Sequence, residues 1–432
     1  MEISALYTCF KECTGVTTDT RKCEPGSMFI ALKGESFNGN QFAGQALQAG
    51  CKYAVVDEEV CDLEKEPRVL RVDNCLKALQ QLANYHRRQL GTYIIGITGT
   101  NGKTTTKELV ANVLKSHYRV LYTQGNFNNH IGVPLTLLNL KEEHEYAVVE
   151  MGANHPGEIK TLVHIAEPDC GLITNVGMAH LEGFGSLEGV IRTKGELYDY
   201  LRESGKNLAF IDADNDYLTG ISHGLDLVAY AEKNTACAAV EGKLGTCNPY
   251  LSFEWKIGEE AHDVTTHLIG SYNLKNALAA IAVGSYFKIP AEKILKALAD
   301  YIPQNNRSQL LETGRNRLVV DAYNANPTSM KAALDNFRYM DVSSKVVILG
   351  DMKELGESSR NEHQKVVEIL NDCHFEKVVL VGKEFQSVDQ ENEHFDDVNS
   401  LILWVRENKP SGHYILIKGS NSMKLDQVVK EL

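Results

Sequence analysis

The amino-acid sequence predicts an α/β protein made of three domains. Its 432 residues suggest about three units, at roughly 100–200 residues each. Short apolar runs alternate with helical patterns along most of the chain, which is typical of parallel sheets covered by helices. A glycine-rich loop joins one of these runs to a helix near residue 100. We therefore expect a smaller N-terminal α/β domain, a central parallel-sheet domain and a C-terminal Rossmann-like domain.

Composition narrows the class of protein. A hydrophobic content of 43% with 23% charged residues is typical of a globular protein with an ample core. The net charge of −13 argues against nucleic-acid binding, which needs a basic face. No apolar run approaches the ~20 residues of a membrane span, and the first four residues do not begin a signal peptide. The ten cysteines are scattered without a Cys-x-x-Cys pair, so we expect reduced thiols in a cytoplasmic protein.

Residues 1–88 are expected to form the N-terminal domain. Apolar patterns predict strands over 28–32 and 53–56, and helices over 41–49 and 74–90. Asp19, Thr20 and Arg21 form a polar stretch before the first strand. The loop from Lys33 through Asn38 to Asn40 is rich in glycine and asparagine. Turn formation explains that loop as well as ligand binding does.

Residues 89–308 and 309–432 are expected to form the central and C-terminal domains. Predicted central strands cover residues 93–97, 120–122, 146–151, 172–174 and 208–211. Helices are expected over 274–287 and 291–299, with an antiparallel excursion within 221–272. C-terminal strands are expected over 318–320, 346–349, 378–381 and 414–417, with helices over 328–337, 362–370 and from about 425. This second alternation indicates a doubly wound sheet.

The loop between the first central strand and its helix has the chemistry of a phosphate-binding loop. Gly99 and Gly102 let backbone N–H groups turn toward an anion, and the following helix adds its positive N-terminus. Lys103 supplies a charge for the phosphates, and the Thr104 hydroxyl can bind Mg²⁺. The Walker spacing is not met, because Ile97 stands where its first glycine is expected. An ordinary strand-to-helix turn is the alternative, but Gly-Lys-Thr in this context favours a nucleoside triphosphate site.

Polar residues also follow other central strands. Glu150 ends a buried strand at the same sheet edge as the phosphate loop, where it could hold Mg²⁺ with Thr104. A helix cap or a solvated acid is the alternative. His180 lies in a strand-end loop and could bind a second metal ion, although a lone histidine is more often structural. Lys194 falls where residues 192–196 are expected to open a helix, and composition alone indicates a solvated surface lysine.

Three further loops are rich in polar residues. Asn128 and Asn129 lie in a glycine- and amide-rich stretch that could present donors to a substrate or simply form turns. Residues 321–330 join a strand to a helix, with a plain N-cap and first-turn proline as the alternative. Lys418 and Ser420 follow the last predicted strand at the shared edge.

Together these motifs resemble the ATP-dependent Mur ligases of bacterial peptidoglycan synthesis. The resemblance covers all three domains, from Asp19 to Ser420, and Gly-Thr-Asn-Gly-Lys-Thr is the Mur ligase form of the phosphate loop. The stretches 321–330 and 349–356 are similar to those of the ligases that act on UDP-N-acetylmuramoyl-tripeptide and D-alanyl-D-alanine. The resemblance implies ATP-dependent amide formation through an acyl phosphate. It also implies ATP and two Mg²⁺ ions, and we expect a monomer.

The resemblance also implies roles for individual residues. The expected catalytic residues are Lys103, Glu150, His180 and Lys194, the last as a carbamate, and the expected metal ligands are Thr104, Glu150 and His180. ATP is expected at Gly99, Thr100, Asn101, Gly102, Lys103, Thr104, Thr105, Asn273, Arg307 and Asp321. The two other substrates are expected at Asp19, Thr20, Arg21, Lys33, Asn38, Asn128, Asn129, Asn324, Asn326, Ser329, Lys418 and Ser420. The N-terminal domain would bind the UDP-sugar, the central domain ATP, and the C-terminal domain would close over the nucleotide with the dipeptide.

Other functions remain open from the sequence. A Mur-family ligase that adds a different amino acid would share most of these motifs, although the Tyr-Asn-Ala-Asn-Pro stretch argues against it. A P-loop kinase would phosphorylate its substrate and stop there. A non-enzymatic nucleotide-binding regulator would bind ATP without turnover, and the combination of Glu150, His180 and Lys194 argues against that class.

Overall fold

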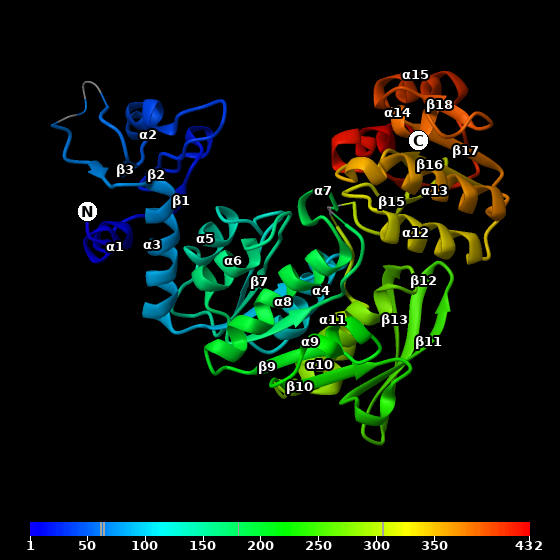
Figure 1. Cartoon of the computed structure of the whole chain (residues 1–432), viewed down its shortest axis with the longest axis horizontal. Coiled ribbons are helices and arrows are strands. Elements are labelled where there is room, and N and C mark those ends of the chain that lie inside the picture. The colour runs from blue at the N-terminus through cyan, green and yellow to red at the C-terminus, as the bar shows by residue number, and fades with distance from the viewer. Residues whose placement is uncertain (61–62, 64, 180, 305) are drawn as a thin grey trace.

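Three sheets divide the chain into N-terminal, central and C-terminal units, which follow one another across the molecule (Figure 1). The computed structural model describes residues 1–60, 63, 65–179, 181–304 and 306–432. The predicted α/β class with three domains is confirmed. Among the described helices, none is long and apolar enough to cross a membrane.

The N-terminal unit is a small parallel sheet with the strand order β1-β2-β3-β4. Its elements are α1 (Ile3–Lys11), β1 (Val16–Thr17), η1 (Thr20–Lys22), β2 (Met28–Ile30), η2 (Gly39–Phe42), α2 (Ala43–Gln48), β3 (Tyr53–Val56), β4 (Val69–Arg71) and α3 (Cys75–Leu90). The predicted strands and the helix over 74–90 are confirmed, whereas the helix over 41–49 starts with a 3-10 turn. The Asn74 side chain caps α3, and α3 packs against α5 and α6 of the central unit.

The central unit is a nine-stranded mixed sheet in the order β13-β12-β11-β10-β9-β8-β5-β7-β6. Its strands are β5 (Tyr93–Thr98), β6 (Val120–Tyr122), β7 (Tyr146–Glu150), β8 (Cys170–Ile173), β9 (Leu208–Asp212), β10 (Asp226–Ala231), β11 (Val240–Cys247), β12 (Tyr250–Ile257) and β13 (Glu260–Ile269). Its helices are α4 (Lys103–Lys115), α5 (Gly132–Leu137), α6 (Glu158–Ala166), α7 (Leu181–Phe184), α8 (Leu187–Glu203), α9 (Asp216–Ile221), η3 (Thr235–Cys237), α10 (Asn273–Tyr286) and α11 (Ala291–Ala299).

The expected antiparallel excursion is confirmed for β11, β12 and β13. The sheet is parallel from β6 through to the β10–β11 pair, so β10 extends the parallel part into the stretch predicted to be irregular.

Helices cover both faces of the central sheet, because its strands are apolar on both sides. On one face Ile94, Val149 and Ile173 pack with residues of α6 and α8. On the other face Ile97 and Val148 pack with residues of α4 and α10. The strands β5, β7 and β8 are parallel neighbours in the sheet, so their carboxyl ends lie at the same edge, where polar side chains can meet.

The C-terminal unit is a six-stranded sheet in the order β14-β15-β19-β16-β17-β18, parallel except for the edge strand β14. Its elements are β14 (Gln309–Glu312), β15 (Arg317–Asp321), α12 (Pro327–Tyr339), β16 (Lys345–Gly350), η4 (Gly356–Ser358), α13 (Ser359–Cys373), β17 (Lys377–Val381), α14 (Lys383–Gln386), β18 (Glu393–Phe395), α15 (Val398–Asn408), β19 (Tyr414–Lys418), η5 (Asn421–Met423) and η6 (Leu425–Glu431). The predicted strands and two inner helices are confirmed, while the predicted closing helix is a 3-10 helix. The elements β14, β18 and α15 were not predicted.

Candidate active site

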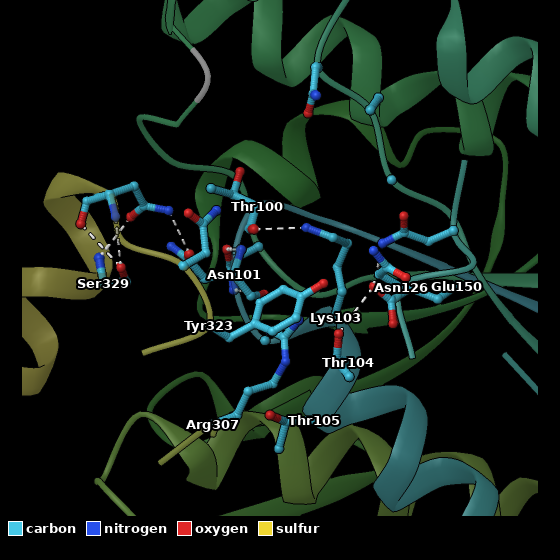
Figure 2. A pocket seen from close by; sticks show the side chains of 18 of the residues that line it. Thr100, Asn101, Lys103, Thr104, Thr105, Asn126, Glu150, Arg307, Tyr323 and Ser329 are labelled. Carbon is cyan, nitrogen blue, oxygen red and sulfur yellow. Dashed lines mark hydrogen bonds between the residues drawn. The ribbon is translucent and has the colours of Figure 1, made fainter. Parts of the chain in front are cut away.

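A cavity of about 850 Å³ lies at the edge where β5, β7 and β8 end. All three units line it: α3 contributes Leu76 and Gln80, the central unit contributes the phosphate loop, and the C-terminal unit contributes the start of α12. Figure 2 shows side chains from the central and C-terminal units converging on this space.

The phosphate loop requires glycine at two positions. Gly99 has a φ of +143°, and a Cβ there would lie 2.0 Å from the Thr174 Oγ1 atom. Gly102 has a φ of +76°, and a Cβ there would lie 2.5 Å from the Asn276 Oδ1 atom. The loop is also held to the end of β8, because the N–H groups of Thr100 and Asn101 donate to Asn175 at 2.9 Å each. Its shape is therefore preorganised, with α4 starting at Lys103.

Lys103 lies over its own loop. Its Nζ atom donates to the carbonyl oxygens of Gly99 at 2.8 Å and Thr100 at 2.9 Å (Figure 2). Burial lowers the pKa of Lys103 to about 8, with Glu150 opposing and Arg307 adding to that decrease. A phosphate group at the loop would supply the countercharge that favours the protonated lysine.

Glu150 is buried, and only one of its two carboxylate oxygens has hydrogen-bond partners in the described structure. Its Oε1 atom accepts from the Thr104 hydroxyl at 3.2 Å and from the Asn128 side chain at 2.9 Å. Its Oε2 atom is buried without a hydrogen-bond partner among the described residues. An unpartnered buried carboxylate oxygen beside a hydroxyl fits a hard cation such as Mg²⁺.

The rest of the predicted metal site has few protein ligands. No cluster of three or more His, Cys, Asp or Glu side chains suited to a metal occurs in the described part of the chain. Magnesium commonly takes one or two protein carboxylates and completes its shell with water and phosphate oxygens, so Thr104 and Glu150 fit that pattern. His180, the predicted ligand of a second ion, lies outside the described residues.

Lys194 is not a solvated surface residue, which corrects the interpretation from composition. It lies in the middle of α8, which starts at Leu187 rather than at residue 192, and it is 2% exposed. Its Nζ atom donates to the carbonyl of Ala153 at 3.3 Å and lies 5.2 Å from the centre of the Phe184 ring. Burial, together with the nearby charge of Lys103, lowers the pKa of Lys194 to about 7. A large fraction of this amine is therefore neutral and nucleophilic near neutral pH.

Three predicted nucleotide-binding residues that follow later in the chain, Asn273, Arg307 and Asp321, line the same cavity. The Arg307 guanidinium lies 3.7 Å from the centre of the Tyr323 ring, as Figure 2 shows, and its Nε atom is buried without a hydrogen-bond partner among the described residues. Asp321 pairs with the buried Lys418, with 2.5 Å between Oδ2 and Nζ. The side-chain amide of Asn273 donates to the carbonyl of Ile269 at the end of β13 at 2.8 Å.

Asn326 connects the two larger units directly. Its Oδ1 atom accepts from the Ser329 N–H at 2.9 Å and caps α12, so the plain N-cap alternative is correct for this atom. Its Nδ2 atom donates to the Asn101 Oδ1 atom at 2.8 Å, which joins the C-terminal unit to the phosphate loop. Both polar atoms of its side chain therefore have partners within the protein. The substrate-binding role of Asn326 stays a prediction.

The predicted substrate residues divide into two groups. Those that line the cavity are Asn128, Asn129, Asn324, Asn326, Ser329 and Lys418. Ser420 does not line it, and its hydroxyl instead accepts from the Lys353 N–H at 2.9 Å.

The remaining predicted substrate residues do not line the cavity and belong to the N-terminal unit: Asp19, Thr20, Arg21, Lys33 and Asn38. They are held by local pairs. Asp19 pairs with Arg21 at 2.8 Å, while Lys33 lies 3.1 Å from Asp57 and 2.7 Å from Glu58.

Several residues at the cavity were not predicted. Gln80 on α3 and Thr161 on α6 line it from helices whose sequences carry no motif, so only the packing of these helices reveals them. Tyr323 lies inside a stretch noted in the sequence, but its contact with Arg307 depends on tertiary packing. Asn276 lies in a predicted helix, and the packing of α10 against α4 brings it to Thr106. Asn175 holds the phosphate loop from the following strand end, which sheet topology alone could have indicated.

Comparison with known proteins identifies the family of the chain. Residues 97–284 match the Mur ligase middle domain, 306–421 the Mur ligase glutamate ligase domain, and 12–87 the Mur ligase family catalytic domain. UDP-N-acetylmuramoyl-tripeptide–D-alanyl-D-alanine ligase of Bacillus subtilis is 38% identical over 97% of this chain and 93% of its own length. The corresponding Escherichia coli ligase is 37% identical over 96% and 93%.

Solved structures give the same result. The crystal structure of MurF from Acinetobacter baumannii superimposes with a TM-score of 0.87 at 30% identity, covering 100% of this chain and 98% of that one. MurF ligase of Thermotoga maritima in complex with ADP has a TM-score of 0.85 at 26% identity, covering 96% of both chains. The chain therefore belongs to the Mur ligase family. Within that family it groups with the MurF ligases.

Proposed function

We propose that this chain is the ATP-dependent ligase that joins D-alanyl-D-alanine to UDP-N-acetylmuramoyl-tripeptide in peptidoglycan synthesis. One observation carries the proposal. The phosphate loop and the half-satisfied Glu150 line one cavity where all three units meet, and the buried Lys194 donates to the carbonyl of Ala153, which lines the same cavity. The relatives of that name align with nearly the whole chain.

The chemistry takes two steps. The terminal carboxylate of the tripeptide attacks the γ-phosphorus of ATP, and ADP leaves as an acyl phosphate forms. The amine of the dipeptide then attacks the acyl carbon, loses a proton and expels inorganic phosphate, which leaves the amide. A free carboxylate is a poor electrophile, and phosphorylation gives it a leaving group. Catalysis of this kind depends mainly on positioning and on charge stabilisation.

The residues of the cavity supply both. The backbone N–H groups of the phosphate loop and Lys103 would bind the phosphates of ATP. Thr104 and Glu150 would hold a Mg²⁺ ion that neutralises charge on the transferring group, and His180 a second ion. Asn273, Arg307 and Asp321 would contact the nucleotide, and closure of the C-terminal domain would exclude water from the acyl phosphate.

The three units would divide the substrates among them. Residues 1–88 would bind the UDP-sugar through Asp19 to Arg21 and the loop from Lys33 to Asn38, residues 89–308 would bind ATP, and residues 309–432 would close with the dipeptide. We place the enzyme in the cytoplasm, since the described cysteines are all free thiols, and we expect it to be a monomer.

Lys194 would act as a carbamate. Its buried, partly neutral amine can attack CO₂, which converts a cation into an anionic oxygen ligand beside the metal site. Lys194→Ala should lose most activity, and acetate or formate should restore part of it by replacing the missing carboxylate. Full activity in Lys194→Ala, unaffected by bicarbonate or acetate, would contradict the carbamate.

The reaction itself is tested by phosphate release. The purified chain with ATP, Mg²⁺ and UDP-N-acetylmuramoyl-tripeptide should release phosphate only when D-alanyl-D-alanine is present, with the UDP-linked pentapeptide as product. Tripeptides carrying lysine or diaminopimelate as the third residue should be compared. ADP formation without the dipeptide would instead indicate a kinase, and turnover with another amino acid a different Mur ligase.

A further inference from the structure

A second lysine of α4 is completely buried and has no part in the reaction described above. Lys107 is 0% exposed and is among the largest fully buried side chains of the described chain. It follows Lys103 by four residues and Thr104 by three, so all three side chains project from one face of α4. That face therefore points toward both the phosphate loop and the end of β7.

The contacts of Lys107 lie at the end of β6. Its Nζ atom donates to the carbonyl oxygen of Thr123 at 2.8 Å, one residue beyond the end of that strand. It also lies 3.4 Å from the Glu108 Oε1 atom and 5.2 Å from the centre of the Tyr122 ring. An apolar side chain of similar volume often stabilises a fold as well as a buried charge does. Stability alone therefore gives no reason for an ammonium group at this position.

Thr123 connects this lysine to the metal-binding carboxylate. Its own N–H donates to the carbonyl of Val148 at 3.0 Å, which extends the β6–β7 pairing. Its hydroxyl oxygen accepts from the N–H of Glu150 at 3.0 Å. The loop that leaves Thr123 carries Asn128, whose amide donates to the Glu150 Oε1 atom at 2.9 Å. Glu150 is thus held through Thr123 at its backbone and through the following loop at its side chain.

We propose that Lys107 is a positioning residue for the metal site. By fixing the carbonyl of Thr123, it holds the backbone of Glu150 so that the unpartnered Oε2 atom stays directed at the cation. The inference rests on the proposed function, because it needs a divalent cation at Glu150. Residues that orient a metal ligand typically change metal affinity about 10–100-fold when they are replaced.

The test is the Mg²⁺ dependence of ADP binding, measured by calorimetry on the full chain. Lys107→Met should raise the half-saturating Mg²⁺ concentration about 10–100-fold and leave ADP affinity in EDTA within about twofold. Thr123→Val, which keeps the shape but loses the hydroxyl, should give the same shift, and the double variant should add little to it. Lys115→Met is the matched control, because Lys115 lies on the same helix over the same Tyr122 ring but is exposed.

A second measurement needs no metal. In ligand-free protein, backbone amides of residues 120–133 should exchange faster in Lys107→Met than in wild type or in Lys115→Met. Faster exchange together with the Mg²⁺ shift would support the positioning role.

Four outcomes would overturn it. An unchanged Mg²⁺ dependence in folded Lys107→Met would do so, and so would equal losses of ADP affinity with and without Mg²⁺, which indicate damage to the phosphate loop. If Lys107→Met does not fold, an unchanged Mg²⁺ dependence in Thr123→Val decides against the proposal. Wild type that binds ADP and makes the pentapeptide without any Mg²⁺ dependence would remove the metal site while leaving the ligase function intact.

Discussion

Lys33 in the N-terminal unit is expected to bind substrate, and Lys194 in the central unit is expected to support the metal site, but the surroundings of the two lysines differ. Lys33 is partly exposed and lies within 3.1 Å of two carboxylates, Asp57 and Glu58. Lys194 is 2% exposed, and in the described structure its Nζ atom donates to a neutral carbonyl, that of Ala153. Glu150, in the same unit, has a buried oxygen without a partner in the described structure.

The two regions differ in how completely their charged groups are paired in the absence of ligand. In the N-terminal unit the charges satisfy one another, so a ligand has to replace pairs that water also weakens. In the cavity the charges are desolvated and incompletely paired, so ATP and its metal would supply what is missing. Substitutions should therefore act on catalysis in the cavity and on substrate affinity in the N-terminal unit.

The largest effect is expected at Glu150. Glu150→Gln keeps the shape and the contacts of one oxygen but removes the charge that would hold the cation. We expect kcat to fall at least about 100-fold, with the requirement for Mg²⁺ increased. The measurement is phosphate release as a function of Mg²⁺ concentration.

Glu158→Gln provides the control within the same cavity. The Oε2 atom of Glu158 already accepts from the N–H groups of Asn154 at 2.7 Å and His155 at 3.1 Å, and its Oε1 atom lies 3.6 Å from the His155 Nδ1 atom, so neither oxygen is buried without a partner as the Glu150 Oε2 atom is. Equal losses of kcat in the two variants would show that the unpartnered oxygen of Glu150 has no special role, which would contradict the prediction.

Lys194 should make the stability of the protein depend on pH. Its pKa is about 7 when folded, against an ordinary value of 10.5, so the unfolded state binds more protons between these values. The free energy of unfolding contributed by this group therefore rises from pH 7 toward pH 10.5, and the full cost of burial is present below pH 7. Relative to wild type, Lys194→Met should be more stable at pH 6, by as much as about 5 kcal/mol, and this advantage should shrink by pH 9.5.

Denaturant unfolding in CO₂-free buffer measures this directly. A stability difference that stays constant between pH 6 and 9.5 would mean that Lys194 is not protonated differently in the two states. Lys52→Met, at an exposed lysine paired with Glu12, should show no such trend.

Substitution of Lys33 is expected to change substrate affinity rather than catalysis or stability. Lys33→Met is expected to raise KM for the UDP-linked tripeptide about tenfold while kcat and Tm stay unchanged, because uniform binding is lost. Steady-state kinetics with varied tripeptide substrate provides the measurement, with Lys52→Met as the matched surface control. A large fall in kcat would place Lys33 in the chemistry instead.

The smallest effect is expected at the bond between the phosphate loop and α12. Asn326→Ser keeps a good helix cap but loses the 2.8 Å bond to Asn101, a contact worth about 1 kcal/mol. KM for ATP should rise by no more than about fivefold. Asp397→Ser, at the similarly capped start of α15, is the control. A loss confined to the affinity for D-alanyl-D-alanine would favour the predicted substrate contact over the interdomain bond.

Sequence reasoning succeeded where the chemistry is local. The phosphate loop, its helix and the strand ending at Glu150 were predicted, because glycine spacing and apolar runs act over a few neighbouring residues. It failed for the environment of Lys194, which composition placed at the surface. The polarity of a helix position depends on what packs there, and β8, α6 and α7 cover this part of α8.

By itself the sequence determined the α/β class, the three units, the phosphate loop and, through its motifs, the resemblance to Mur ligases. Only the tertiary structure decided that Lys194 is desolvated, that Glu150 keeps one oxygen free, and that Asn326 bonds to Asn101. It also brought Lys107 to Thr123, which lies sixteen positions along the chain on another element. Local patterns follow from backbone geometry and side-chain type, whereas pKa values and unpartnered atoms follow from burial, which arises when distant elements pack together.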